Sequence, residues 1–148
     1  YGDFEGDTMG VPKYTRETIA AVIERKSRFV LARKISRLKY AIDTFKKLLS
    51  LGKALSATFD NGIENKRHQE LGVQTYFCHS YSSWEKGAIE NVFSLIREFI
   101  PKKSSLANYT ESDIQAIVKL INERPRKCLS YHTPKEVFEE QVLSANSP

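Results

Sequence analysis

The sequence predicts an α/β fold in which helices flank a mixed five-stranded sheet, with three antiparallel meander strands and two parallel strands. Three observations predict it. The first third of the chain holds alternating and β-rich runs, a strongly amphipathic stretch follows them, and two more short apolar runs precede further helical patterns. Parallel strands need crossover connections, which place helices on the faces of a sheet.

The three N-terminal strands are predicted by alternation and by β-branched residues. Residues 3–9 put Phe4, Gly6 and Thr8 on one face and acidic side chains on the other. Residues 17–25 and 28–35 are β-rich runs separated by a short polar turn. We therefore expect an antiparallel meander at the start of the chain.

Helices and two more strands follow in order. Residues 38–49 carry apolar side chains at helical spacing and predict a helix that ends at Gly52. Residues 55–59 and 73–77 are short apolar strands, and a short or irregular helix is expected between them. Three further helices are predicted: residues 86–100 before Pro101, a helix capped by Thr110, and a last helix that begins at residues 133–136.

Length and composition favour one globular domain over residues 1–148. The chain is 41% hydrophobic and 28% charged, with 7 Gly and 5 Pro, which excludes collagen-like and disordered classes. The longest apolar run, residues 19–23, is far too short to span a membrane, and no signal-peptide pattern opens the chain. Because the sequence lacks an initiator methionine, we expect a domain cut from a longer protein.

Charge and cysteine usage narrow the function classes. Two cysteines without CxxC spacing predict neither a disulfide framework nor a zinc site and favour a reducing cytoplasm. The net charge is +5, and residues 11–53 carry twelve basic against three acidic side chains. A basic block beside an acidic strand suits a polyanion held near bound metal, although a solvated basic face is an open alternative.

Three carboxylates from three elements are candidate metal ligands. Asp7 lies toward the end of the first strand, Asp60 ends the fourth, and Glu90 lies on the helix that follows the sheet. Mg²⁺ prefers such oxygen ligands, and two ions could stabilise both oxygens of an in-line phosphoryl displacement. Alternatives stay open, because Asp3 and Glu5 share the face of Asp7, Asp60 opens a common turn signal, and Glu90 could be a surface residue.

Four segments together resemble the catalytic core of DDE transposases, most closely the IS30-type transposases of bacterial insertion sequences. They are residues 2–7 (GDFEGD), 58–62 (TFDNG), 81–91 (YSSWEKGAIEN), and 122–129 (NERPRKCL) with 133–138 (TPKEVF). The resemblance covers nearly the whole chain and implies an RNase H-like fold. It departs from the usual pattern in a short spacing between Asp60 and Glu90 and in Ser83, which stands where a proline is usual.

This resemblance also implies a function. The triad maps to Asp7, Asp60 and Glu90, and water cleaves a DNA strand that a 3′-hydroxyl then joins, both steps with Mg²⁺ or Mn²⁺. The expected partners are transposon-end and target DNA and further copies of the chain, without a membrane. The expected setting is the bacterial cytoplasm near the nucleoid, and a DNA-binding domain is expected N-terminal to residue 1.

Three basic residues are predicted to contact DNA. Lys86 lies at a helix N-terminal turn, and Arg126 and Lys127 belong to the fourth segment, where a structural role is equally open. The main hypothesis is a transposase catalytic domain that carries out metal-dependent polynucleotidyl transfer. The alternatives are a stand-alone nuclease of the same fold and a non-catalytic module that only binds DNA or self-associates.

Overall fold

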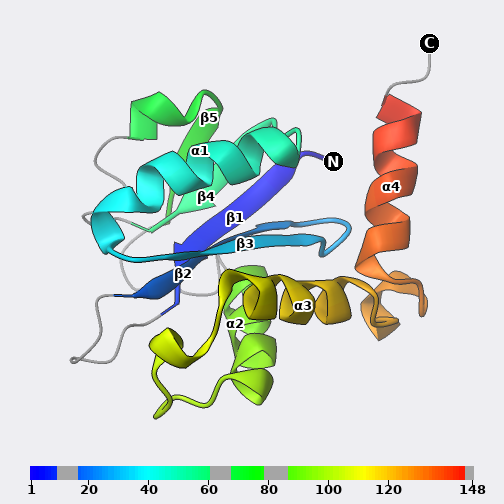
Figure 1. The fold of residues 1–148 in the computed structure, drawn as a ribbon. Coiled ribbons are helices and arrows are strands. Elements are labelled where there is room, and N and C mark those ends of the chain that lie inside the picture. The colour runs from blue at the N-terminus through cyan, green and yellow to red at the C-terminus, as the bar shows by residue number, and fades with distance from the viewer. Residues whose placement is uncertain (10–16, 61–67, 79–86, 146–148) are drawn as a thin grey trace.

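Five strands form one mixed sheet in the computed structural model, which describes residues 1–9, 17–60, 68–78 and 87–145. The strands are β1 (Asp3–Thr8), β2 (Thr18–Glu24), β3 (Val30–Ile35), β4 (Ser56–Phe59) and β5 (Gln74–Phe77). Their order is β3-β2-β1-β4-β5 (Figure 1). β1 to β3 pair antiparallel, whereas β4 pairs parallel with both β1 and β5. The predicted meander and parallel pair are confirmed.

In the described parts of the chain, four α-helices flank the sheet: α1 (Ala41–Leu51), α2 (Gly87–Phe99), α3 (Glu111–Asn122) and α4 (Pro134–Ala145). Each follows a predicted amphipathic or capped segment. Thr110 and Asp113 form a reciprocal capping box at the start of α3, as their spacing predicts. Short 3₁₀ helices precede α1 at Leu38–Tyr40 and lie at His68–Leu71, in the interval where an irregular helix was expected.

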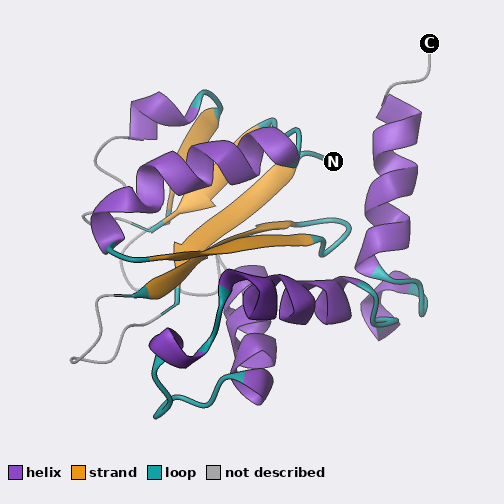
Figure 2. Ribbon diagram, in the orientation of Figure 1, coloured by secondary structure: helices purple, strands orange, loops and turns teal. Residues whose placement is uncertain are grey.

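The helices divide between the two faces of the sheet (Figure 2). On one face α1 packs over a cluster of buried side chains that includes Phe4, Phe45 and Phe59. On the other face α2 and α3 pack over a cluster that includes Met9, Ile19 and Ile89. The side chains of β1 alternate between these two clusters, so Phe4 and Met9 belong to opposite layers. This arrangement is an RNase H-like fold.

Helix α3 follows the free edge of β3 and satisfies its backbone groups. The side-chain amide of Asn122 accepts from the Val30 N–H and donates to the Val30 carbonyl, both at 2.9 Å. Gln115 donates to the Ala32 carbonyl at 2.8 Å, and Glu111 accepts from the Lys34 N–H at 3.0 Å. A helix that covers a strand edge in this way protects it from pairing with another chain.

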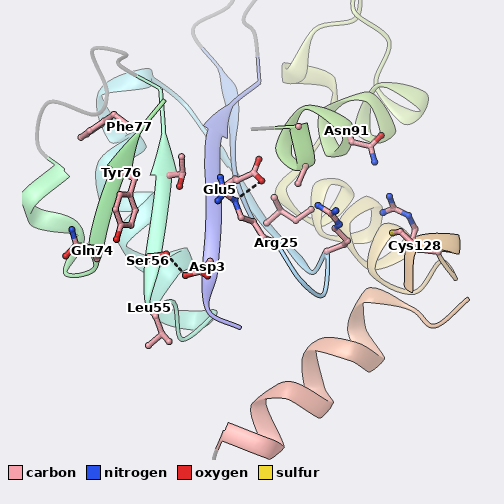
Figure 3. A pocket seen from close by; sticks show the side chains of 16 residues that line it. Asp3, Glu5, Arg25, Leu55, Ser56, Gln74, Tyr76, Phe77, Asn91 and Cys128 are labelled. Carbon is pink, nitrogen blue, oxygen red and sulfur yellow. Dashed lines mark hydrogen bonds and ion pairs between the residues drawn. The ribbon is translucent and has the colours of Figure 1, made fainter. Parts of the chain in front are cut away.

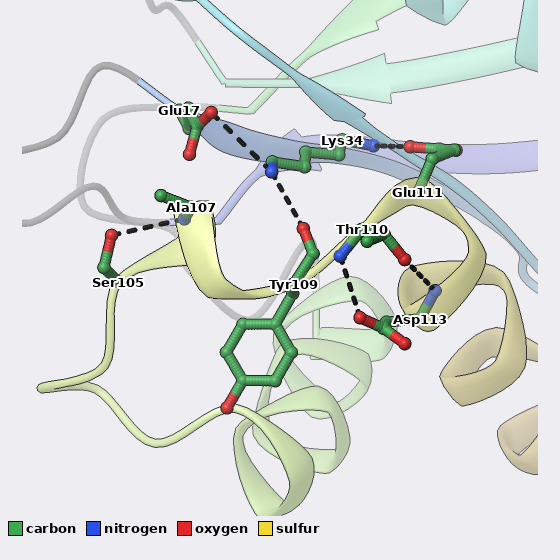
Figure 4. A network of polar contacts seen from close by, with 8 residues as sticks. All are labelled: Glu17, Lys34, Ser105, Ala107, Tyr109, Thr110, Glu111 and Asp113. Atoms are coloured by element: carbon green, nitrogen blue, oxygen red, sulfur yellow. Dashed lines mark hydrogen bonds and ion pairs between the residues drawn. The ribbon is translucent and has the colours of Figure 1, made fainter.

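Lys34 strengthens this junction from the other direction (Figure 4). Its ammonium group donates to the Tyr109 carbonyl at 2.8 Å and lies 3.6 Å from a carboxylate oxygen of Glu17. The turn before α3 is thereby held against the start of β2 and the end of β3. The position of α3 then fixes the segment that follows it, which contains Arg126.

The C-terminal helix α4 contacts the rest of the domain through Phe138. Its ring stacks on Phe29 with centroids 4.3 Å apart and lies 6.4 Å from the ring of Tyr1. At the start of α4, Thr133 Oγ1 accepts from the Glu136 N–H at 3.1 Å, as the predicted cap requires. Within the described residues, no helix combines the length and apolar character needed to cross a bilayer.

Candidate active site

The three acidic side chains on one face of β1 have three different environments. Asp3 accepts a 2.6 Å hydrogen bond from the Ser56 hydroxyl at the start of the strand. Glu5 is 4% exposed and binds both the Ile89 N–H and Arg25. Asp7 is half-buried near the end of the strand, where its Oδ1 accepts from the Thr8 N–H at 2.8 Å. Alternation alone leaves these acids equivalent, and the tertiary structure separates them.

The pairing of β1 with β4 brings Asp7 and Asp60 together. The parallel register aligns Asp3 with Ser56, Phe4 with Ala57 and Glu5 with Thr58. Continued by two residues, the same register sets Asp60 beside Asp7, directly after the last residue of β4. Ala57 and Phe59 belong to the α1 cluster, so alternation directs Asp60 to the opposite face, the face of Asp7.

Gly6 permits this close pairing of the two strands. A Cβ atom on Gly6 would lie 2.4 Å from Cε1 of the Phe59 ring, which is fully buried. The ring of Phe59 in turn packs against Phe45 of α1 with centroids 4.9 Å apart. The glycine between Glu5 and Asp7 is therefore required by packing rather than by backbone conformation.

Glu90 reaches the same side of the sheet from a helix. It lies in the first turn of α2, is exposed, and directly follows Ile89, which is buried in the cluster under α2 and α3. At 3.6 residues per turn, Glu90 lies on the other flank of α2 from Ala88. The structure thus assigns all three predicted ligands to the α2 side of the sheet.

The carboxylates of Asp7, Asp60 and Glu90 are ligands suited to a hard divalent cation, although the described side chains do not form a compact metal-binding cluster. Carboxylates at the ends of two adjacent strands and on one helix provide the oxygen ligands that Mg²⁺ prefers. Among the described residues, no three His, Cys, Asp or Glu side chains lie close enough together to form a metal-binding group. Adjacent carboxylates repel one another in the absence of a cation, which opposes such a cluster.

A groove of about 1210 Å³ opens on this side of the sheet, between the strands and the N-terminus of α2 (Figure 3). We call it the arginine groove because three of its lining residues are Arg25, Arg28 and Arg126. Tyr76 of β5 and Asn91 of α2 also line it and lie on opposite sides of it in Figure 3. None of the three predicted metal ligands is among the described residues that line the groove.

Arg126 is the predicted DNA-contacting residue that the groove contains. One of its terminal guanidinium nitrogens is buried and has no hydrogen-bond partner among the residues that the structure describes. A buried donor without a partner costs free energy, so an acceptor such as a phosphate oxygen would stabilise it. The backbone of Arg126 is fixed by hydrogen bonds with His132 and Tyr131.

The other predicted DNA contacts have different outcomes. Lys127 is exposed at the start of a 3₁₀ helix, Lys127–Leu129, and is absent from the described lining of the groove. Lys86 lies outside the described residues. The neighbouring Arg124 has a structural contact, because its guanidinium lies 3.6 Å from the Glu98 carboxylate of α2.

Sequence reasoning missed Glu5, Arg25 and Arg28 as parts of the site. Arg25 and Arg28 lie in the basic block of residues 11–53, but nothing in their spacing separates them from the ten other basic residues there. Glu5 carried a usable signal, since a carboxylate two residues before Asp7 on the same face is expected to point toward the same layer. Its contact with the Ile89 N–H depends on α2, where Ile89 is 84 residues away in the chain.

The fold and this site define a class: an RNase H-like domain with carboxylates at two strand ends and on an adjoining helix, beside an arginine-lined groove. No protein-family model matches the chain. Curated relatives do match, and they include transposases of bacterial insertion sequences.

Three relatives illustrate the similarity. The transposase InsI of insertion sequence element IS30C from Escherichia coli K12 is 38% identical over 151 residues, which cover 95% of this chain and 39% of that protein. The transposase of IS4351 from Bacteroides fragilis is 36% identical over 157 residues, 99% of this chain and 47% of the relative. The transposase of IS1086 from Cupriavidus metallidurans is 37% identical over 152 residues, which cover 97% of this chain and 44% of that relative.

Over nearly its whole length the chain is thus similar to transposases of IS30-type insertion sequences. It spans between about two fifths and one half of the length of these relatives. The predicted resemblance is thereby confirmed.

Proposed function

We propose that this chain is the catalytic domain of a transposase, which cuts DNA strands and joins them by metal-dependent polynucleotidyl transfer. The observation that carries the proposal is the parallel register of β1 and β4. Extended by two residues, this register aligns Asp7 with Asp60 and supports their common location on the sheet face covered by α2, the helix of Glu90. The names of the relatives support the transposase class, since they describe proteins of insertion sequences.

In this proposal Asp7, Asp60 and Glu90 form a DDE triad that holds two Mg²⁺ or Mn²⁺ ions. When bound, such ions stabilise the attacking and the leaving oxygen of an in-line phosphoryl displacement. The protein fixes two of the carboxylates on a rigid sheet and brings the third from a helix terminus. Preorganised ligands of this kind reduce the reorganisation that the reaction otherwise requires.

DNA is the proposed substrate, and the arginine groove supports its binding. Three guanidinium groups line the groove, and Arg126 presents a buried donor that lacks an acceptor. Arginine is suited to phosphate because its planar fork can form two parallel hydrogen bonds. We extend the proposal to transposon-end and target DNA, to a multimer that pairs two DNA ends, and to the cytoplasm near the bacterial nucleoid.

The decisive experiment is Asp60→Asn in the purified chain, assayed on an oligonucleotide duplex that carries terminal inverted-repeat sequence of an IS30-type element. The amide keeps the shape of the side chain but removes the ligand charge, so we expect strand transfer to fall by at least about a hundredfold. Asp3→Asn is the matched control, because it makes the same change on the same face at a residue bound to Ser56. Circular dichroism checks that both variants fold.

The DNA products of this assay distinguish the transposase proposal from the two alternative functions, a stand-alone nuclease and a non-catalytic module. Unchanged transfer by Asp60→Asn refutes the proposal. Cleaved DNA without any joined product favours a stand-alone nuclease, and DNA binding without Mn²⁺ binding in calorimetry favours a non-catalytic module.

A further inference from the structure

Glu5 is a charged side chain in the interior of the domain. Its 4% exposure leaves almost no contact with water, and a buried carboxylate costs several kcal/mol unless it is paired and hydrogen-bonded. The contacts that compensate for this cost therefore show what the side chain does. Both contacts are with residues outside β1.

The two carboxylate oxygens have separate partners. Oε1 accepts from the backbone N–H of Ile89 at 3.2 Å, and Oε2 accepts from Nε of Arg25 at 3.0 Å. Figure 3 shows Glu5 between β1 and the N-terminus of α2, with its bond to Arg25 drawn. The first amides of a helix have no partner within the helix, and a negative charge there is favoured by the helix dipole.

The bridge connects β1 and α2, two of the three elements that carry the proposed triad. Glu5 is two residues before Asp7 on β1, and Ile89 directly precedes Glu90 on α2. A change in the length of the Glu5 side chain therefore alters the position of Glu90 relative to Asp7. Displacements of about 1 Å in a catalytic site can cost about a hundredfold in rate.

We propose that Glu5 is a positioning residue that holds the first turn of α2 against β1, so that Glu90 is presented to the metal ions bound by Asp7 and Asp60. This inference rests on the proposed function. It separates Glu5 from Asp3, which lies on the same face of the same strand but binds Ser56 and makes no described hydrogen bond to α2. It also separates Glu5 from a metal ligand, because both of its oxygens are engaged by protein donors.

Length and charge can be tested separately at this position. Glu5→Gln keeps the length and an oxygen for the Ile89 N–H but loses the charge, whereas Glu5→Asp keeps the charge but is one methylene shorter. Loss of charge is tolerable, because the side chain of Arg25 is 41% exposed and water can solvate it. A positioning role predicts that Glu5→Gln is mild and Glu5→Asp is severe, and a ligand role predicts the reverse order.

Three readouts are measured on the full chain. For Glu5→Asp and Glu5→Ala we expect kcat of strand transfer to fall by about a hundredfold with KM for DNA unchanged. We expect Mn²⁺ affinity in calorimetry to fall by about tenfold, as for loss of a group that orients a metal ligand. Hydrogen exchange at the Ile89 amide should accelerate in both variants and stay slow in Glu5→Gln.

Glu139→Ala, at an exposed acidic position of α4 that is not part of the described lining of the arginine groove, is the control, and it should leave all three readouts at the level of the unmodified chain. If Glu5→Asp retains full activity and a protected Ile89 amide, the positioning role is wrong while the proposed function stands. A loss in Glu5→Gln as large as that in Glu5→Ala also overturns it. If the unmodified chain neither transfers strands nor binds Mn²⁺, the proposed function itself fails, and the exchange data then report on the helix contact alone.

Discussion

Single residues in β1 have roles that their neighbours do not share. The short run from Asp3 to Asp7 contains a surface acid, a buried aromatic, a buried acid, a glycine and a half-buried acid. Each role follows from the partner on another element: Ser56 for Asp3, α2 for Glu5, and the Phe59 ring for Gly6. The strand is thus a set of specific contacts rather than a uniform amphipathic segment.

Gly6→Ala tests the closest of these contacts. The new methyl group would overlap the Phe59 ring, which is enclosed by the core, so we expect the free energy of unfolding to fall by about 2 kcal/mol. Urea denaturation measures it. Gly87→Ala is the matched control, because a Cβ there meets no atom within 4 Å, and alanine at the first residue of α2 should be neutral or stabilising. Equal effects of the two substitutions would contradict the packing argument.

At the scale of elements, α3 is the part that completes the sheet. Its apolar stripe is buried in the cluster with α2, whereas Glu111, Gln115 and Asn122 satisfy backbone groups of the edge strand β3. Asn122, the first residue of the segment 122–129 (NERPRKCL), therefore has a structural role. It fixes the end of α3, from which the chain continues to Arg126.

Asn122→Ala is expected to destabilise the junction of α3 and β3. It leaves the Val30 N–H and carbonyl without the amide that pairs with them, and each buried unsatisfied group costs about 1 to 3 kcal/mol. Thermal and urea unfolding measure the loss. Lys119→Ala, on an exposed position of the same helix, should change stability by less than about 0.5 kcal/mol. A comparable loss in both variants would contradict a specific contribution of the Asn122 contacts with Val30, because alanine raises helix propensity at both positions.

At the scale of the whole molecule, the two faces of the sheet have different tasks. The α1 face is closed by an apolar cluster, and the α2 face carries the predicted ligands and the arginine groove. Acidic and basic side chains thus lie on the same side of the sheet, as the proposed binding of both cations and a polyanion requires.

Arg126→Ala tests the groove as a DNA-binding surface. Loss of one phosphate contact lowers the slope of log Kd against log salt concentration by about one, so affinity should fall most at low salt. Fluorescence anisotropy with a labelled DNA duplex, without metal, measures this slope. Arg124→Ala removes the same charge two residues away, where the side chain pairs with Glu98, and should leave the slope unchanged. A shift of equal size in both variants would argue for general charge rather than the groove.

Much of this organisation was predictable from local patterns. Alternation, helical spacing and capping residues predicted all five strands and four α-helices, with boundaries accurate to within a few residues. These patterns are readable from the sequence because each depends on backbone geometry over only a few consecutive residues. The resemblance in four segments gave the family. Asp7, Asp60 and Glu90 were chosen on that basis, and their role as metal ligands stays a prediction.

The sequence by itself determined where the strands and helices lie and which family the chain resembles, since these are written in short-range periodicity and short motifs. Only the tertiary structure decided which acid of β1 contacts α2, that β1 pairs parallel with β4 in the register of Glu5 with Thr58, and that Asn122 pairs with Val30. Those contacts join segments as many as 92 residues apart. No local period encodes them, because they arise only when apolar burial forces distant segments into one packed interior.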